Sequence, residues 1–227
     1  KEKKHKLIGG YVKQSIPGIY DNILILDFKS LYPSIIRTFN IDPWTYQEKK
    51  RKDSLVLVNN SAFKREKGIL PEILEELWKE RDTVKKEKNE MKSFALKTVM
   101  ASFIGVLGSE QCRFFNPLLA NAVTTMGQEI IKLTAQKIEE QGYEVIASDT
   151  DSCFIYTKET DIKKADFIGK QLAKEIDLFF KNYIKEKYNC VSLLEFEYEK
   201  LFKRFLMPKL RGGEKGAKKR YVGLVEK

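Results

Sequence analysis

Residues 143–156 read Tyr143-Glu144-Val145-Ile146-Ala147-Ser148-Asp149-Thr150-Asp151-Ser152-Cys153-Phe154-Ile155-Tyr156, and this stretch decides the fold. Two hydrophobic, β-prone runs flank the four polar residues 149–152, a pattern that predicts a β-hairpin with a tight turn. The turn carries two carboxylates, which repel each other unless a cation neutralises them, so a hard divalent ion is their natural partner. Taken alone, such a turn is weak support for a metal, because acidic turn residues usually satisfy nearby backbone groups.

A further acidic residue, Asp27, ends a second predicted strand. The run Ile23-Leu24-Ile25-Leu26 is long enough for a buried strand and too short for a helix. Pro33 follows at a position that suits the first turn of a helix. Asp27 is therefore either a helix cap or one of two acidic strand ends that converge on paired metal ions for a phosphoryl transfer.

Four stretches of the chain resemble the motifs of family B DNA polymerases, in the family's order and spacing. Motif A is matched by Asp27-Phe28-Lys29-Ser30-Leu31-Tyr32-Pro33-Ser34-Ile35-Ile36, motif B by Lys97-Thr98-Val99-Met100-Ala101-Ser102-Phe103-Ile104-Gly105, motif C by Asp149-Thr150-Asp151-Ser152, and the basic duplex-contacting motif by Lys218-Lys219-Arg220-Tyr221. The resemblance runs from about Gly9 to Leu224, and the flanking residues are most similar to bacterial members of the family.

Hydrophobic patterning and turn residues predict a mixed order of strands and helices, which is typical of an α+β fold. We expect further strands at residues 9–12, 19–26, 55–58, 191–198, 200–207 and 220–225, and helices at 71–89, 91–107, 117–141 and 161–183. The resemblance implies a polymerase palm with a mostly antiparallel sheet and packed helices, plus an inserted two-helix fingers subdomain. The expected division is palm at 1–69, fingers at 70–108 and palm again at 109–227, with the thumb and exonuclease outside this chain.

The resemblance also implies a two-metal nucleotidyl transfer from a dNTP to the 3′-hydroxyl of a DNA primer. Asp27 and Asp151 would hold two Mg²⁺ ions, for which Mn²⁺ can substitute, and the carbonyl of Phe28 would be an additional ligand. Asp149 belongs to the catalytic motif but would support the site more than it ligates. One ion would lower the pKa of the primer hydroxyl, and the other would neutralise the triphosphate and the leaving pyrophosphate.

Five residues are implied to bind the incoming dNTP. Arg81, Lys85 and Lys97 would bind its triphosphate, since several fixed cations are needed there. Leu31 would donate its backbone amide, and Tyr32 would act as a steric gate that excludes the 2′-hydroxyl of ribonucleotides. From charge and pattern alone, the basic residues could simply solvate a helix face, and Tyr32 could be a core aromatic.

The basic motif at Lys218, Lys219, Arg220 and Tyr221 would contact the backbone of primer–template DNA in a salt-dependent, sequence-independent way. Without the resemblance, a lysine run near a terminus is a solvated tail. The partners implied are primer–template DNA and dNTPs, with a sliding clamp as a candidate through regions outside this chain. No membrane partner is expected.

The chain departs from the family pattern in two places. Ala101 and Ile104, in the base-pair pocket of motif B, stand where Asn and Tyr are usual. Ala147-Ser148 precedes motif C where Tyr-Gly is usual. These positions adjoin the nascent base pair and the primer terminus in the family, so altered fidelity is expected, whereas no expected metal ligand is changed.

Composition agrees with a polyanion partner. The chain has 42 basic and 32 acidic residues, a formal net charge of +10 and a pI near 9.3. Three widely spaced cysteines suit a reduced cytosolic protein, nucleoid-associated if bacterial, and the single histidine, His5, excludes histidine-based chemistry. No uncharged apolar run reaches the roughly 18 residues of a membrane span. We expect the chain to be a piece of a larger polymerase.

Two alternative functions stay open at this level. One is a non-catalytic member of the same fold that binds primer–template. Intact Asp27 and Asp151 disfavour it, while Ala101, Ile104 and Ala147 modestly favour it. The other is a different palm-type nucleotidyltransferase, such as a primase or cyclase.

Overall fold

The computed structural model describes residues 6–210, 216–217 and 219–225. The chain divides into two compact units. Unit 1 comprises residues 1–9, 30–127 and 183–193, and unit 2 comprises residues 10–29, 128–182 and 194–227.

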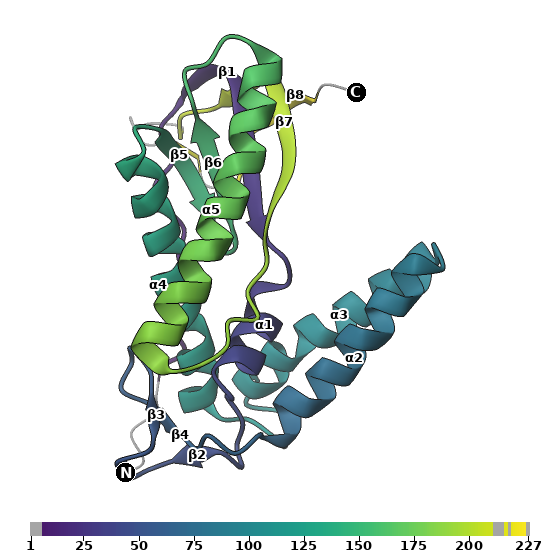
Figure 1. Cartoon of the computed structure of the whole chain (residues 1–227), viewed down its shortest axis with the longest axis vertical. Coiled ribbons are helices and arrows are strands. Elements are labelled where there is room, and N and C mark those ends of the chain that lie inside the picture. Colours follow the sequence, from purple (N-terminus) through teal and green to yellow (C-terminus); the bar gives the residue numbers. More distant parts are fainter. Residues whose placement is uncertain (1–5, 211–215, 218, 226–227) are drawn as a thin grey trace. The chain divides into compact units, whose positions relative to one another are not determined.

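Unit 2 is built on a five-stranded sheet with the order β5-β6-β1-β7-β8, in which every neighbouring pair is antiparallel (Figure 1). Its strands are β1 (Gly18–Phe28), β5 (Glu144–Asp149), β6 (Ser152–Tyr156), β7 (Phe196–Met207) and β8 (Val222–Val225). β1 is the middle strand, paired with β6 on one side and β7 on the other, and its run from Ile23 to Leu26 is at most 2% exposed. The mostly antiparallel α+β fold is confirmed.

One face of this sheet packs against α5 (Ile162–Tyr188). The ring of Phe28, on β1, lies 5.6 Å from that of Phe180 on α5 and 4.5 Å from that of Phe196 on β7. Next to them, a Cβ on Gly169 of α5 would lie 2.6 Å from the ring of Tyr198, so the helix approaches β7 closely. Successive side chains of a strand point to opposite faces of the sheet, so the Asp27 side chain points to the face opposite α5.

That opposite face carries an apolar cluster drawn from β1, β5, β6 and β7: Ile23, Ile25, Ile146, Ala147, Phe154, Phe202, Phe205 and Met207. The helix α4 (Pro117–Glu140) precedes β5 and ends near Gly142, whose φ of +88° lies in the left-handed region where glycine is favoured. Asp161 begins α5 by accepting a 2.8 Å hydrogen bond from the backbone N–H of Lys163, as the sequence predicts.

Unit 1 contains three helices that contact one another, α1 (Leu31–Thr38), α2 (Ile69–Lys86) and α3 (Glu90–Gly108). Asn89 caps α3 by accepting a hydrogen bond from the N–H of Lys92. A small sheet, with the order β2-β4-β3, consists of Tyr46–Gln47, Ala62–Phe63 and Leu55–Val56. The two predicted helices of the 70–108 region are thus present, and their role as fingers stays a prediction.

Two strand predictions were wrong. Residues 9–12 form no strand, although the carbonyl of Tyr11 accepts a hydrogen bond from the N–H of Thr150. Gly9 and Gly10 offer no side chains for a sheet to bury, which disfavours a strand there. Residues 191–195 are also outside any strand, and the two strands predicted at 191–198 and 200–207 are the single strand β7. Between Ile25 and Leu26 of β1 the pairing skips Glu199 of β7, and this bulge lets β7 pair with β1 as one continuous strand.

Within the described part of the chain, α3 is the one helix long and apolar enough to cross a membrane, with a mean hydropathy of 1.3 over its best window. Length and composition alone make this weak support for a membrane span. Lys92 and Lys97 interrupt its apolar residues, as the sequence shows.

Candidate active site

The hairpin of β5 and β6 places its acidic turn beside the end of β1. Asp27 pairs with Ser152 across the sheet, and Asp149 pairs with Ser152 from the other side. The backbone N–H of Phe28 donates a 2.9 Å hydrogen bond to the carbonyl oxygen of Asp151. The two acidic strand ends predicted from the sequence therefore converge within unit 2. Asp27 is no helix cap, because the N-cap of α1 is Ser30.

Backbone conformation in the turn is strained. Thr150 has a φ of +36°, a region that β-branched residues rarely adopt. Its N–H is held by a 3.1 Å hydrogen bond to the carbonyl of Tyr11, which fixes the turn from outside the hairpin. Strain of this kind is tolerated where surrounding contacts enforce it, and it is concentrated at functional sites.

A row of four residues crosses the sheet at the level of the turn: Asp149, Ser152, Asp27 and Glu197. Directly paired residues of neighbouring antiparallel strands present their side chains on the same face, so three carboxylates share the face opposite α5. Glu197 was missed by the sequence reasoning. No local pattern marks it, because its place depends on the register of β7 against β1.

Lysines accompany the two outer carboxylates of this row. The Nζ of Lys219 lies 3.0 Å from Oδ1 of Asp149. The Nζ of Lys29 lies 2.5 Å from Oε2 of Glu195 and 3.5 Å from Oε1 of Glu197. The basic motif near the end of the chain therefore meets motif C directly.

The remaining described residues of the basic motif, Arg220 and Tyr221, are exposed at the same part of unit 2. The ring of Tyr221 lies 5.1 Å from that of Phe154 and 5.2 Å from that of Phe205, over the apolar cluster of the sheet. These contacts anchor the motif beside the carboxylates. Lys218, also predicted to bind DNA, lies outside the described residues.

The substitutions before motif C are accommodated inside the unit. Ala147 is 6% exposed and belongs to the apolar cluster. Ser148 is 2% exposed, and its Oγ accepts a 2.9 Å hydrogen bond from the backbone N–H of Lys13. Ser148 thereby ties β5 to the chain segment that precedes β1.

Unit 1 holds the residues predicted to bind the nucleotide. Leu31 is buried, and Tyr32 is half-buried with its ring against Gly127 of α4, where a Cβ would lie 3.0 Å from Cε1 of Tyr32. Lys85 is exposed on α2, whereas Arg81 is only 8% exposed. Among the described residues, Nε of Arg81 has no hydrogen-bond partner. A buried guanidinium N–H without a partner requires an explanation, and an anionic ligand is one.

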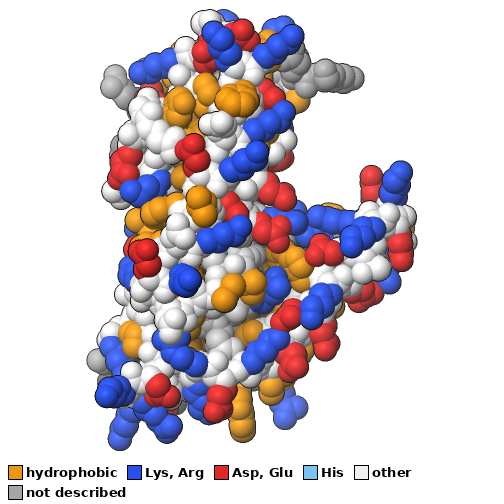
Figure 2. Space-filling model, in the orientation of Figure 1, with side chains coloured by type: hydrophobic (Ala, Val, Ile, Leu, Met, Phe, Trp, Pro, Cys, Tyr) orange, Lys and Arg blue, Asp and Glu red, His pale blue; other side chains and the backbone are white. Residues whose placement is uncertain are grey.

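On α3, Lys97, Ala101 and Ile104 recur at the spacing of one helical face. Lys97 and Ala101 are exposed and Ile104 is half-buried, so the two residues predicted to line the base-pair pocket are accessible together with the lysine. On the face drawn in Figure 2, the Lys and Arg side chains over α2 lie among Asp and Glu side chains.

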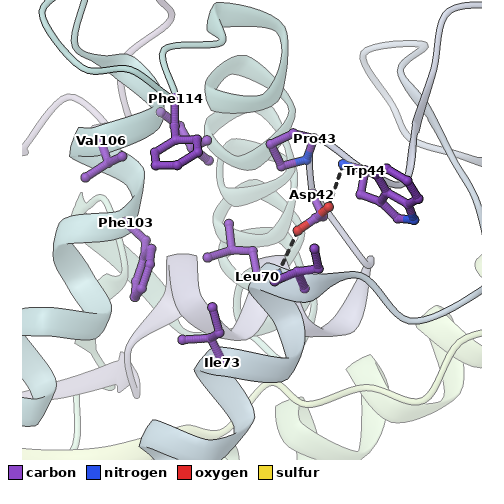
Figure 3. A pocket seen from close by; sticks show the side chains of 10 residues that line it. Asp42, Pro43, Trp44, Leu70, Ile73, Phe103, Val106 and Phe114 are labelled. Atoms are coloured by element: carbon purple, nitrogen blue, oxygen red, sulfur yellow. Dashed lines mark hydrogen bonds between the residues drawn. The ribbon is translucent and has the colours of Figure 1, made fainter.

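Unit 1 also contains an apolar pocket of about 400 Å³ that includes none of the predicted site residues. Its walls come from the segment around Trp44, from Leu70 on α2, and from Phe103 and Phe114 (Figure 3). Both carboxylate oxygens of Asp42 are engaged there, accepting hydrogen bonds from the N–H groups of Trp44 at 2.6 Å and Leu70 at 2.7 Å. The pocket consequently offers little polar chemistry.

The residues of unit 2 fit a hard divalent cation in their donor chemistry. Asp27, Asp151 and the Phe28 carbonyl supply oxygen donors, which Mg²⁺ prefers. In the described parts of the chain, no group of three or more His, Cys, Asp or Glu side chains could hold a metal by itself. Cys153, next to Ser152, is fully buried, and burial raises the pKa of its thiol to about 12, so it offers neither a thiolate ligand nor a nucleophile.

An antiparallel sheet that gathers acidic strand ends beside lysines is the arrangement expected of a palm-type nucleotidyltransferase. The chain belongs to DNA polymerase family B, whose family model matches residues 1–227. The predicted family is therefore confirmed.

Individual proteins that the chain resembles are also DNA polymerases. The chain is 45% identical to DNA polymerase II of Escherichia coli (strain K12) over 98% of its length, and 34% identical to a DNA polymerase of Thermococcus gorgonarius over 89%. These matches span only 29% and 27% of the two relatives. The solved structure of the family B DNA polymerase from Pyrobaculum calidifontis matches with a TM-score of 0.66 and 25% identity, covering 99% of this chain and 28% of that one.

Proposed function

We propose that this chain is the catalytic part of a DNA-directed DNA polymerase, which transfers dNMP from dNTP to the 3′-hydroxyl of a DNA primer. The observation that carries the proposal is the convergence of Asp27 and Asp151 at the end of one antiparallel sheet, joined through the hydrogen bond between Phe28 and Asp151. Membership of family B supplies the reaction class.

Asp27, Asp151 and the carbonyl of Phe28 would hold two Mg²⁺ ions, with Asp149 supporting them. Bound there, Mg²⁺ would supply charge stabilisation and a more acidic primer hydroxyl. Asp27, at the end of β1, and Asp151, in the hairpin turn, are held by backbone pairing, so little reorganisation of these oxygen donors would be needed to bind the ions.

Residues of unit 1 would bind the nucleotide. Arg81, Lys85 and Lys97 would bind the triphosphate, and the buried Nε of Arg81 supports an anion there. Leu31 would donate its amide, and Tyr32 would exclude the ribose 2′-hydroxyl. Ala101 and Ile104 would line the base-pair pocket with smaller or non-aromatic groups than the family usually has.

Duplex DNA would be bound through Lys219, Arg220 and Tyr221, together with Lys218. The exposed cations would contact phosphates, and the packing of Tyr221 on Phe154 would hold them at the sheet. We propose that the chain forms the palm at 1–69 and 109–227 and the fingers at 70–108.

The test is Mg²⁺-dependent primer extension by the full-length protein, beside its Asp151→Ala variant. The wild type is expected to extend the primer with dNTPs. The extension rate of the variant should be lower by about three orders of magnitude or more, because a directly ligating group is removed. The control variant is Asp166→Ala, on α5 and outside the site, which should retain wild-type extension. Tight primer–template binding without extension by the wild type would favour a non-catalytic module, and a preference for NTPs would favour another nucleotidyltransferase.

A further inference from the structure

Lys29 occupies a constrained position between the end of β1 and the start of β7. Its backbone N–H donates a 2.9 Å hydrogen bond to the carbonyl of Glu195. Its ammonium lies 2.5 Å from a carboxylate oxygen of Glu195 and 3.5 Å from one of Glu197. The Lys29 side chain is 18% exposed and therefore largely buried.

Glu197 is the cross-strand partner of Asp27 on β7. Side chains at directly paired positions of antiparallel strands have Cβ atoms about 5 Å apart on the same face. A cation held by Asp27 is therefore within reach of the Glu197 carboxylate. Lys29, two residues after Asp27, competes with such a cation for the Glu197 carboxylate.

We propose that Lys29 is a positioning residue that keeps Glu197 out of the set of metal ligands. The inference rests on the proposed function, because it concerns the cation that Asp27 and Asp151 would bind. With Glu197 paired to Lys29, the site presents fewer uncompensated negative charges. A site with less negative charge binds a divalent ion more weakly, which suits an ion that must arrive with a nucleotide and leave with pyrophosphate.

A purely structural role of Lys29 predicts a different result. If Lys29 only joins β1 to β7, its removal lowers the stability of the sheet and leaves the affinity for a divalent ion unchanged or weakened. If Lys29 withholds Glu197, its removal tightens ion binding, and the tightening disappears when Glu197 loses its charge as well.

The experiment measures Mn²⁺ binding to the full-length protein by electron paramagnetic resonance, without DNA or nucleotide. Lys29→Met is expected to bind Mn²⁺ about fivefold more tightly than the wild type, the equivalent of one partly exposed ion pair. Lys29→Met combined with Glu197→Gln should return to wild-type affinity. Glu197→Gln alone should leave the affinity unchanged, because the Lys29 ammonium stays paired with Glu195 and adds no free positive charge to the site. Lys170→Met, which removes the same charge from the Lys170–Asp166 ion pair on α5, is the matched control and should also have no effect.

Three results would overturn the proposal. They are unchanged or weaker binding in a folded Lys29→Met protein, tightening that persists in the double variant, and weaker binding in Glu197→Gln alone. The last variant keeps the test decisive if Lys29→Met does not fold. Asp151→Asn separates this inference from the proposed function: if the wild type and Asp151→Asn bind Mn²⁺ alike, the metal site itself is wrong, whichever way the Lys29 variants behave.

Discussion

The backbone N–H of Phe28 donates a hydrogen bond to the carbonyl oxygen of Asp151, joining the end of the central strand to the acidic turn. The Phe28 side chain points the other way, into the packing between the sheet and α5. Phe28 thus connects the packing of the core with the positions of two carboxylates. Asp27 precedes it in the sequence, and Asp151 accepts its backbone hydrogen bond. The stability of unit 2 and the geometry of the candidate site should therefore depend on the same side chain.

Replacement of Phe28 by Ala should lower the free energy of unfolding by about 3–5 kcal/mol, because a fully buried aromatic ring is lost. The side chain is 1% exposed and contacts the rings of Phe180 and Phe196. Urea unfolding followed by circular dichroism measures the change. Phe167→Ala, at a 60% exposed position on α5, is the matched control and should stay within about 0.5 kcal/mol of wild type. Equal effects of the two variants would contradict the packing described here.

Lys219→Ala should weaken binding of primer–template DNA about equally for different sequences. Its ammonium is exposed beside Asp149, where it can contact a phosphate. Loss of one phosphate contact should reduce the slope of log affinity against log salt concentration by about 1. Fluorescence anisotropy over a salt series measures both quantities, and Lys170→Ala serves as the control. An unchanged slope would remove Lys219 from the DNA interface.

Gly127→Ala should raise the KM for dNTP severalfold with a smaller effect on kcat. The new Cβ would lie 3.0 Å from Cε1 of Tyr32, so the ring must move by a few tenths of an ångström away from α4. A displaced ring would occupy more of the space proposed for the sugar. Steady-state kinetics with dNTP and NTP measure the effect.

Gly108→Ala is the control for this change, because its added Cβ would meet no atom closer than 3.9 Å. If Gly127→Ala and Gly108→Ala give the same KM values for dNTP, Tyr32 does not border the sugar.

Tyr32→Val should weaken the exclusion of ribonucleotides, because the smaller side chain leaves room for a 2′-hydroxyl. Incorporation of NTP relative to dNTP should rise by roughly tenfold or more.

The stability of the protein should decrease at alkaline pH through Cys153. Burial raises the pKa of this thiol from its ordinary 9.0 to about 12. The folded protein thus keeps the proton to higher pH than the unfolded chain. The stabilising contribution is complete below pH 9 and is lost as the pH rises toward 12, by up to about 1.4 kcal/mol per pH unit. Denaturant unfolding between pH 8.5 and about 10.5 should show a weaker pH dependence in Cys153→Ala than in wild type. Parallel curves would refute the assignment.

The hairpin and the end of β1 could be predicted from the sequence because their signals are local. Alternating β-prone runs around residues 149–152 define the turn, and the apolar run before Asp27 defines a buried strand. The start of α5 at Asp161 is equally local, since a cap needs only the next few residues.

The partners of the carboxylates could not be predicted in this way. Glu197 stands opposite Asp27 because β7 pairs with β1 in a particular register, interrupted by a bulge that no sequence signal announces. Lys219 reaches Asp149 because Tyr221 packs on the sheet. The burial of Arg81, expected to be an accessible cation, depends on how α2 packs in unit 1. Each of these contacts joins segments far apart in the chain.

The central place of β1 has a consequence for synthesis of the protein. Its two neighbours, β6 and β7, are encoded far downstream, so β1 leaves the ribosome with both edges open and with its most apolar residues unburied. An unpaired, apolar strand is prone to associate with other chains. The nascent polypeptide must therefore be shielded until translation reaches β7, and slow elongation across this region should increase its dependence on chaperones.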